Sequence, residues 1–186
     1  MKKIYQKQLI LLGGGHGNVQ VLQKLCMNEY VGLHTIMISD SFEATYSGMT
    51  PGYVKNEYLK NEIQVDLQRL CFNAGATFIK DSIISLDHKL NEITLKKKTN
   101  IRFDILSINT GTISRTNKIL ISNDSKYILV KPINNLVKEL PEIYKILNSL
   151  NIANIAIIGS GVAAYEISFS LKQRYQDKLK ILIVGK

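Results

Sequence analysis

An α/β fold with parallel strands is predicted by one pattern that occurs twice and by the order of the elements between the two copies. In the first copy, an apolar run at residues 8–12 is followed by three glycines and then by apolar residues at helical spacing. The second copy begins in the same way at residues 155–158. Strands that alternate with helices usually form parallel sheets covered by helices. The two copies therefore predict two βαβ units in one chain.

The first predicted unit ends with a strand at residues 34–39. This segment is rich in Ile and Met, as is typical of a strand that is buried on both faces of a parallel sheet. Residues 40–57 contain Gly48, Pro51 and Gly52 among small polar and aromatic residues, which predicts a long irregular segment. Long loops in compact domains are often functional.

The middle of the chain predicts one helix and four strands. Apolar residues at helical spacing from residue 65 to 71 indicate a helix that Gly75 ends. Apolar and alternating runs then predict strands, with a turn at residues 88–91 between the second and the third. These strands are expected at residues 76–80, 82–87, 92–96 and 104–109.

The remaining residues lead into the second unit. Residues 114–126 predict a polar connection, 127–130 a short strand, and 133–150 a mostly helical segment in which Pro141 begins a second piece. A strand at 155–158, a helix at 162–175 and a third element at 179–184 then repeat the order of the first unit. We expect three parts, which are residues 1–131, 132–153 and 154–186.

Neither composition nor charge indicates a nucleic-acid partner or a membrane span. The 186 residues are 45% hydrophobic and carry a formal net charge of +9, but the basic residues are scattered apart from the run at 96–98. No basic stripe interleaved with aromatic residues accompanies the charge, so we expect no nucleic acid. No uninterrupted apolar run reaches the roughly 18 residues that cross a bilayer, although contact with a membrane surface stays open.

The two cysteines predict packing rather than a metal site. Cys26 and Cys71 fall in predicted helices and have neither a C-x-x-C spacing nor the spacing of metal ligands. Unpaired cysteines of this kind suit a reducing compartment, so we expect a cytoplasmic location.

The first glycine turn has the pattern of a dinucleotide phosphate site. In a Rossmann-like fold, one glycine permits the tight turn, a second lets the backbone approach the pyrophosphate, and a third lets helix and strand pack closely. The helix N-terminus then offers N–H groups to the phosphates. Gly13 and Gly15 fill the first two positions, and Asn18 stands at the third. Asn18 either loosens the contact between helix and strand or adds a hydrogen bond through its amide.

The second turn matches the pattern more closely. Gly159 and Gly161 fill the first two positions, and Ala164 is an accepted residue at the third. Either turn alone is weak evidence for a ligand. Two turns in one chain, each between a strand and a helix, make a ligand-free explanation much less attractive.

An acidic residue that binds ribose is expected at the end of the second strand of each unit. In the first unit, Ser39 occupies this position and Asp40 follows one step later. Asp40 is close enough in sequence to reach a ribose hydroxyl. In the second unit, residues 184–186 contain no acid, and Lys186 is weak evidence for a 2′-phosphate.

These features resemble the pyridine nucleotide-disulfide oxidoreductase superfamily, within it the branch without a redox disulfide that includes the type II NADH dehydrogenases. The resemblance covers nearly the whole chain. Residues 103–112 look like the family's strand that ends in Ala-Thr-Gly, whose Thr and Gly close over the flavin nucleotide. The resemblance implies a Rossmann-like three-layer domain with a β-meander crossover that binds FAD. The start of a second Rossmann-like unit, for NAD(P)H, would follow it.

A narrower resemblance concerns residues 11–22 and the string Tyr-Ser-Gly-Met-Thr-Pro-Gly at residues 46–52. Both are similar to the flavoprotein-like module that is fused ahead of selenophosphate synthase in some bacteria. That module also lacks glycine at the position of Asn18. In the family, the loop at 46–52 passes near the flavin ring. The chain has no counterpart of the kinase half of such fusions, so the resemblance implies no selenophosphate chemistry.

The activity that the resemblance implies is FAD-dependent NAD(P)H oxidation, in which a hydride passes to the flavin and electrons pass on to a quinone or another small acceptor. A disulfide-reductase route is excluded because residues 40–55 lack a Cys-x4-Cys pair. Glu166 is the candidate catalytic residue, with a positioning role toward the nicotinamide. His16 either contacts phosphate or flavin or caps the helix, and Tyr46 and Tyr53 either flank the flavin or serve packing. The residues expected to bind cofactors are Gly13, Gly14, Gly15, His16, Asn18, Ser39, Asp40, Met49, Pro51, Ile83, Thr110, Gly111, Gly159, Gly161 and Ala164.

Two alternatives stay open. The chain is either a non-catalytic nucleotide-binding module or a truncated fragment. In the resembled family, a later segment with a Gly-Asp motif completes the FAD domain, and further strands complete the NAD domain. As a fragment, the chain would bind FAD weakly and turn over little.

Overall fold

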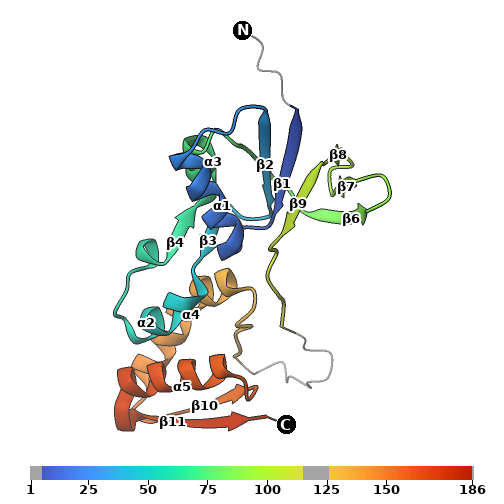
Figure 1. Cartoon of the computed structure of the whole chain (residues 1–186). Coiled ribbons are helices and arrows are strands. Elements are labelled where there is room, and N and C mark those ends of the chain that lie inside the picture. Colours follow the sequence, from blue (N-terminus) through green and yellow to red (C-terminus); the bar gives the residue numbers. More distant parts are fainter. Residues whose placement is uncertain (1–5, 115–125, 186) are drawn as a thin grey trace. The chain divides into compact units, whose positions relative to one another are not determined.

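The computed structural model describes residues 6–114 and 126–185. They form two compact units, each made of segments that are separated in the sequence (Figure 1). Unit 1 contains the chain up to Ala44 and Val65–Thr112, and unit 2 contains Thr45–Gln64 and the chain from Ile113 onward. These two units do not coincide with the three parts expected from the sequence, which end at residues 131 and 153. The three-part division stays a prediction. The polar connection predicted at 114–126 lies almost entirely outside the described residues.

A four-stranded parallel sheet forms the centre of unit 1. Its order is β5-β2-β1-β9, with β1 at Lys7–Leu12, β2 at Leu33–Ser39, β5 at Thr77–Lys80 and β9 at Ile105–Ile108. Leu12 is in register with Ile38 on β2 and with Ile108 on β9. The carboxyl ends of these three strands therefore meet at one edge of the sheet, which is where ligands bind in open α/β folds.

Alternate residues of β1 face two different layers. Leu9 and Leu11 pack in a core with helices α1, His16–Met27, and α3, Leu67–Asn73. Ile10 and Leu12 pack on the other face with Ile93 and Leu95 of an antiparallel meander. Figure 1 shows the helices and the meander on opposite sides of the sheet. The meander consists of β6, Ile83–Asp87, β7, Glu92–Leu95, and β8, Asn100–Arg102. The predicted three-layer α/β domain with a meander is confirmed.

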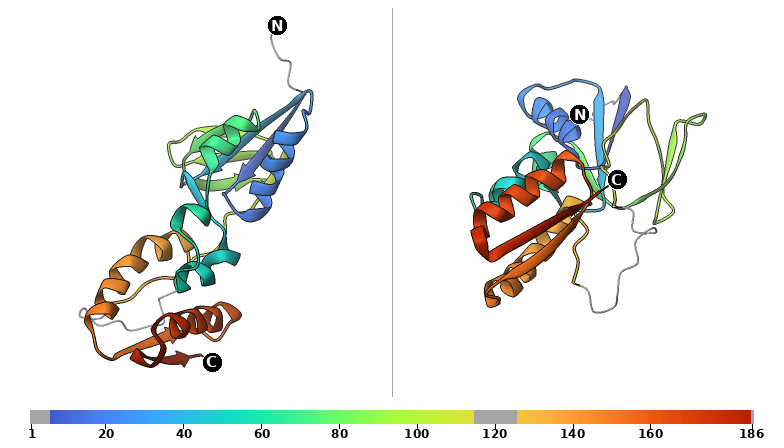
Figure 2. Two further views of the ribbon diagram at one scale, coloured as in Figure 1. Left: turned by 90° about the vertical axis from the view of Figure 1, so that its left-hand side faces the viewer. Right: turned by 90° about the horizontal axis from the view of Figure 1, so that it is seen from below.

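Unit 2 repeats the strand–helix–strand order. Strands β10, Ala153–Ile158, and β11, Leu179–Val184, pair in parallel, and α5, Val162–Tyr175, connects them. Helices α2, Thr50–Lys55, and α4, Ile133–Ser149, pack with them around Val54 and Leu140 (Figure 2). Short 3-10 turns lie at Ser47–Met49, Lys60–Glu62 and Gln176–Lys178. Two short strands, β3 at Glu43–Thr45 and β4 at Gln64–Asp66, form a small separate sheet.

Helix α2 belongs to unit 2 because its carbonyl end is held there. The backbone oxygen of Val54 accepts hydrogen bonds from the Tyr144 hydroxyl at 2.9 Å and from the Arg174 guanidinium at 3.2 Å. The guanidinium also lies 3.7 Å above the Tyr144 ring. Burial raises the pKa of Tyr144 above its ordinary value, and the charge of Arg174 opposes this only in part.

The long irregular segment predicted at 40–57 is wrong in part, because it contains β3 and α2. Pro51 is compatible with α2 since it sits in the first turn, where its missing N–H has no helical acceptor. The strand predicted at 127–130 does not form either. Ile128 and Val130 instead use their apolar side chains to pack against the unit 2 core.

Helix α4 continues through Pro141, where two helical pieces were predicted. A proline inside a helix leaves the carbonyl four residues earlier without its usual donor. Here that carbonyl belongs to Val137, and the Tyr53 hydroxyl donates a long hydrogen bond of 3.4 Å to it. A residue from the segment 45–64 thus supplies what the helix itself lacks. Tyr53 is a packing residue of unit 2.

The two cysteines differ in exposure, and we predict that they differ in reactivity. Cys71 is 1% exposed, and burial, aided by the nearby Cys26, raises its pKa from 9.0 to about 12. Cys26 is exposed. A disulfide reagent at pH 8 should modify one thiol in the native protein and both in denaturant, and Cys26→Ser should leave none reactive in the native state. Equal native rates for both thiols would contradict the burial of Cys71.

The raised pKa of Cys71 also determines how the free energy of unfolding changes with pH. The folded state favours the neutral thiol, so this contribution is fully present below the unfolded pKa of 9.0 and is lost as the pH rises toward about 12. The free energy of unfolding should therefore fall in this alkaline range by less for Cys71→Ala than for the parent chain.

Candidate functional site

The first glycine turn lies at the carboxyl edge of the unit 1 sheet. Gly13 adopts a left-handed backbone conformation with φ of +83°. Its N–H donates to the Ile38 carbonyl at 2.8 Å, and the N–H of Gly15 donates to the Asn109 carbonyl at 3.0 Å. Gly15 is also the N-cap residue of α1. The turn is thereby fastened to the ends of both strands that flank β1.

Asn18, at the third position of the pattern, fixes the start of α1. Its side chain is fully buried. The amide nitrogen donates to the carbonyls of Leu12 at 3.0 Å and Gly13 at 2.8 Å, while the amide oxygen accepts from the Ser107 hydroxyl at 2.7 Å. Of the two roles left open for Asn18, the added hydrogen bond is the one that the structure supports. Ser107, on β9, was missed from the sequence because it lies 89 residues away.

Protein atoms already surround the glycines of the first turn. A Cβ at Gly13 would lie 2.5 Å from the Asn109 carbonyl oxygen, and one at Gly14 would lie 2.5 Å from a methyl group of Leu67. A Cβ at Gly15 would lie 2.1 Å from the side-chain oxygen of Asn109. Backbone atoms of Asn109 therefore require glycine at positions 13 and 15, whereas the nearest atom at Gly14 is the end of the flexible Leu67 side chain.

The N-terminus of α1 carries no charged cap. Its first turn contains no acidic residue, and the N–H of Gly17 donates to the side-chain oxygen of Asn109 at 3.0 Å. His16 is exposed, and its ring nitrogen lies 3.0 Å from the Gln20 amide nitrogen. Asn109 was not predicted as a site residue. In the sequence, Asn109 could have been noticed because it replaces the alanine of the Ala-Thr-Gly pattern.

The other predicted residues of unit 1 gather along the same edge of the sheet. Ser39 is buried at the end of β2, where its hydroxyl accepts from the Ser41 N–H at 3.3 Å, and Asp40 follows it in an exposed position. Thr110 and Gly111 are exposed directly after β9, and Ile83 begins β6.

Asp81 is a polar residue at this edge that the sequence did not predict. It is 9% exposed and follows β5, and its N–H donates to the Ser39 carbonyl at 3.0 Å. Its carboxylate accepts from the N–H groups of Ser82 at 2.8 Å and Lys97 at 3.4 Å. These bonds hold the start of the meander against the sheet, so Asp81 has a structural role.

Met49 and Pro51 belong to unit 2 rather than to the unit that contains the first turn. Met49 ends the 3-10 turn before α2, and Pro51 lies in the first turn of that helix. Neither unit by itself brings them together with Gly13 or Gly15. Their predicted role near a flavin stays a prediction.

The second glycine turn repeats the backbone bond of the first. The N–H of Gly159 donates to the Val184 carbonyl at 2.7 Å, and Gly161 is the N-cap residue of α5. A Cβ at Gly159 or Gly161 would meet nothing within 4 Å. Ala164 is buried, and Glu166 is exposed one turn into the helix. This turn is therefore open where the first is filled.

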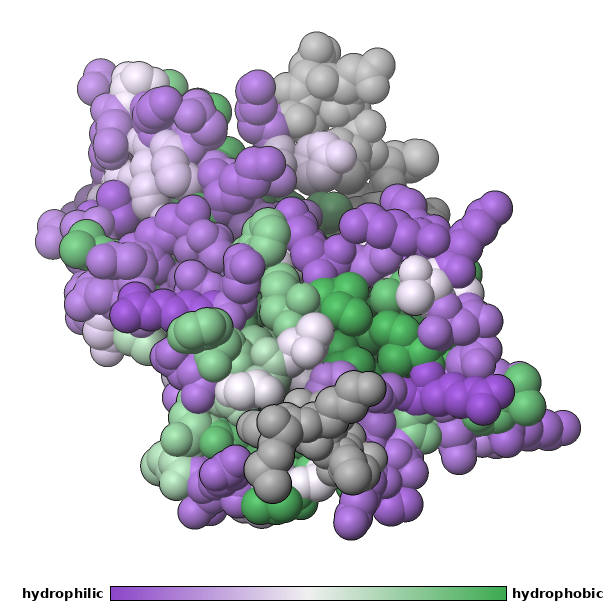
Figure 3. Space-filling model, turned by 90° about the horizontal axis from the view of Figure 1, so that it is seen from above, coloured by the Kyte–Doolittle hydropathy of each residue, from purple (hydrophilic) through white to green (hydrophobic). Residues whose placement is uncertain are grey.

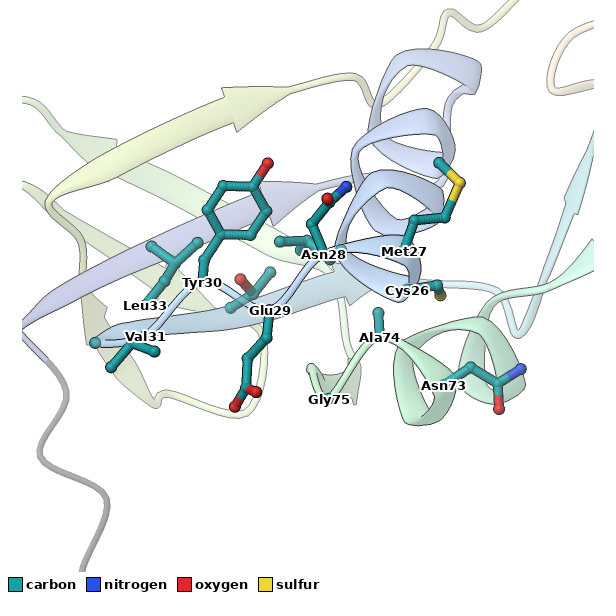
Figure 4. A pocket seen from close by; sticks show the side chains of 13 residues that line it. Cys26, Met27, Asn28, Glu29, Tyr30, Val31, Leu33, Asn73, Ala74 and Gly75 are labelled. Atoms are coloured by element: carbon teal, nitrogen blue, oxygen red, sulfur yellow. The ribbon is translucent and has the colours of Figure 1, made fainter.

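A pocket of about 410 Å³ lies elsewhere in unit 1 (Figure 4). It is lined by the end of α1, the loop at residues 28–32, the start of β2 and the end of α3. That location is the amino end of β2, opposite to the edge that carries the glycine turn. Exposed apolar side chains such as Tyr30 and Val31 occur in this region. Viewed from above, hydrophobic residues gather near the middle of the visible face, and hydrophilic residues surround them (Figure 3).

Among the described residues, no group of three or more His, Cys, Asp or Glu side chains is placed to hold a metal ion. Within residues 6–114 and 126–185, no helix has both the length and the apolar character that a membrane span requires.

Several known proteins are similar to this chain. The NADH dehydrogenase-like protein YutJ of Bacillus subtilis is 23% identical over 183 residues, which are 95% of this chain and 48% of that protein. The sulfide:quinone oxidoreductase of Aquifex aeolicus matches with a TM-score of 0.67 and 20% identity over 96% of this chain and 43% of its own. The water-forming NADH oxidase of Lactobacillus brevis, solved with NADH bound, has a TM-score of 0.71 and 13% identity over 97% and 40% of the two chains. No protein-family model matches.

We predict that Asn18→Gly, which restores the usual glycine, destabilises the protein. The change removes three buried hydrogen bonds and leaves the hydroxyl of Ser107 without its acceptor, so the free energy of unfolding should fall by roughly 3 kcal/mol. Chemical denaturation measures this. Asn28→Ala, which removes one exposed bond at the other end of α1, is the control and should cost less than about 1 kcal/mol. An Asn18→Gly protein as stable as the parent would contradict the assigned role.

The chain spans about half the length of the curated relative that it matches. Its fold is the Rossmann-like α/β fold that it shares with these oxidoreductases of known structure.

Proposed function

We propose that the chain forms the dinucleotide-binding part of an FAD-dependent NAD(P)H oxidoreductase. The observation that carries the proposal is the matching pair of glycine turns. Gly13 and Gly159 each donate an N–H to the end of the neighbouring parallel strand, at 2.8 and 2.7 Å, and each turn leads into a helix. Hydride transfer between two dinucleotides requires two binding sites, and each unit of this chain has one turn of this form.

The described residues fit a dinucleotide at both turns, but not equally. At the second turn, the space beside Gly159 and Gly161 is open, so the backbone at the start of α5 is accessible to a pyrophosphate. At the first turn, the backbone has the required form, but the Asn109 side chain occupies the space beside Gly15. Following the order of the two units in the resembled family, we assign FAD to unit 1 and NAD(P)H to unit 2.

The roles of the residues follow from their positions. The N–H groups at the starts of α1 and α5 would bind phosphate oxygens, with His16 exposed beside the first of them. Asp40 would receive the ribose of the first dinucleotide, and Thr110 and Gly111 would cover it. Glu166, exposed on α5, would orient the nicotinamide of the second. When bound, the flavin would accept the hydride and supply the electron transfer to an acceptor.

A quinone is the acceptor that we propose, in the cytoplasm or at its membrane surface. The support is the likeness to the sulfide:quinone oxidoreductase of Aquifex aeolicus, whose name states its acceptor. The NADH oxidase and the NADH dehydrogenase-like relative support NADH as the donor.

A non-catalytic nucleotide-binding module is the second candidate. The filled first turn favours it, because a side chain lies where the backbone should be open to phosphate. The resemblance to the module fused to selenophosphate synthase, which also lacks the third glycine, belongs with this candidate.

Flavin absorbance separates the two candidates. The purified chain, incubated with FAD and desalted, should retain absorbance near 450 nm, and anaerobic NADH should bleach it if the chain is an oxidoreductase. Addition of a soluble quinone should then restore the absorbance. Retention of FAD or NADH without bleaching would support the non-catalytic module and contradict hydride transfer. A chain that retains neither nucleotide would count against both.

Gly161→Ala tests the second turn without disturbing the fold. The backbone at Gly161 has φ of −78°, which alanine adopts readily, and its Cβ would meet no protein atom within 4 Å. We therefore expect an unchanged free energy of unfolding but about tenfold weaker NADH binding, because the methyl group would keep the pyrophosphate from the backbone. Gln173→Ala, an exposed change further along α5, is the control. Equal NADH affinity for parent and Gly161→Ala would remove the second turn from the site.

A further inference from the structure

We propose that the side chain of Asn109 is a gate on the first glycine turn. It occupies the place that the phosphates of a dinucleotide need, and binding requires it to rotate away. This inference rests on the proposed function of the turn and adds to it a means by which affinity at that site is limited.

The first observation is a hydrogen bond. The side-chain oxygen of Asn109 accepts the N–H of Gly17 at 3.0 Å. Gly17 lies in the first turn of α1, where N–H groups have no acceptor within the helix. Such groups are the ones that bind phosphate oxygens. The amide oxygen of Asn109 thus takes the place of a phosphate oxygen on this N–H.

The second observation is the space beside Gly15. A Cβ at Gly15 would lie 2.1 Å from the side-chain oxygen and 2.4 Å from the side-chain carbon of Asn109. Glycine at this position of the pattern serves to leave room for a pyrophosphate. The amide group of Asn109 lies in that space, beside the residue's own backbone oxygen, which is 2.6 Å from the same point and stays in place when the side chain rotates. At the corresponding Gly161 in unit 2, no atom lies within 4 Å of the same point.

The backbone of Asn109 is anchored independently of its side chain. Its N–H donates to the Leu12 carbonyl at 2.8 Å, and its carbonyl accepts from the Gly15 N–H at 3.0 Å. Rotation of the side chain therefore leaves β9 and the turn in place. The bond that must break is a single neutral hydrogen bond, which corresponds to about a fivefold effect on a binding equilibrium.

Two substitutions at position 109 should change the affinity for ADP in opposite directions. Asn109→Ala removes the amide, so ADP should bind about fivefold more tightly. Asn109→Asp keeps an oxygen acceptor for Gly17 and adds a negative charge that the start of α1 favours and that repels phosphate, so ADP should bind about tenfold more weakly. Adenosine lacks phosphate, and its affinity should not differ among the three proteins. Titration calorimetry with ADP and adenosine measures these constants, with Gly161→Ala present in all three proteins to weaken ADP binding at the second turn.

A purely structural role for Asn109 predicts a different pattern. Asn109→Ala also removes the acceptor of the Gly17 N–H at the start of α1, so its midpoint in urea should fall while its ADP affinity rises. If ADP affinity falls together with stability, the gate is wrong. Asn28→Ala, which loses an asparagine bond at the far end of α1, controls for general destabilisation and should leave ADP affinity unchanged. Should Asn109→Ala not fold, Asn109→Ser shortens the side chain with less disturbance and carries the same expectation.

The outcomes also distinguish the gate from the proposed function. If the parent and Asn109→Ala bind ADP with equal affinity, the gate is wrong and the dinucleotide site stands. If no variant, including Asn109→Ala, binds ADP at millimolar concentration, both the gate and the assignment of a dinucleotide to the first turn are wrong.

Discussion

A single buried amide, the side chain of Asn18, holds the start of α1 against two strands of the unit 1 sheet. Its nitrogen binds the carbonyl groups at the end of β1, and its oxygen binds Ser107 on β9. An unpaired polar group at this depth would be costly, so all of these partners must be in place together. The orientation of α1, the path of the glycine turn and the separation of β1 from β9 all depend on this arrangement.

The two glycine turns have similar backbone hydrogen bonds but different neighbouring side chains. In both turns, a glycine with a positive φ angle donates its N–H to the neighbouring strand. In unit 1, Leu67 and Asn109 fill the space that the absent side chains leave, whereas in unit 2 that space is open. A glycine turn by itself is therefore consistent with two situations, a tightly packed connection and an accessible phosphate site. The surrounding side chains decide between them.

The sequence was sufficient for features that depend on local pattern. Strands β1 and β10 and helix α5 were predicted because each combines an apolar run or helical spacing with a glycine boundary. Strand β2 was predicted from its run of Ile and Met, and the element at β11 from the repeated order of the first unit. Contacts between distant segments could not be predicted this way. The Ser107 partner of Asn18, the Tyr53 hydroxyl that completes α4 at Pro141, and the membership of residues 45–64 in unit 2 all depend on pairs far apart in sequence. The run at 127–130 was misjudged because apolar residues serve packing as well as strand pairing.

Because protein atoms pack against Gly13, conservation of this glycine among related sequences would not by itself indicate nucleotide binding. A side chain at Gly13 would collide with the backbone of residues 109 and 110, so selection for folding alone would preserve this glycine. A lineage that no longer used a nucleotide would keep it. Gly161 experiences no such constraint from the described residues, because a Cβ there would meet none of their atoms within 4 Å. Among related sequences, drift at position 161 rather than at position 13 would be the trace left by a site that has lost its function.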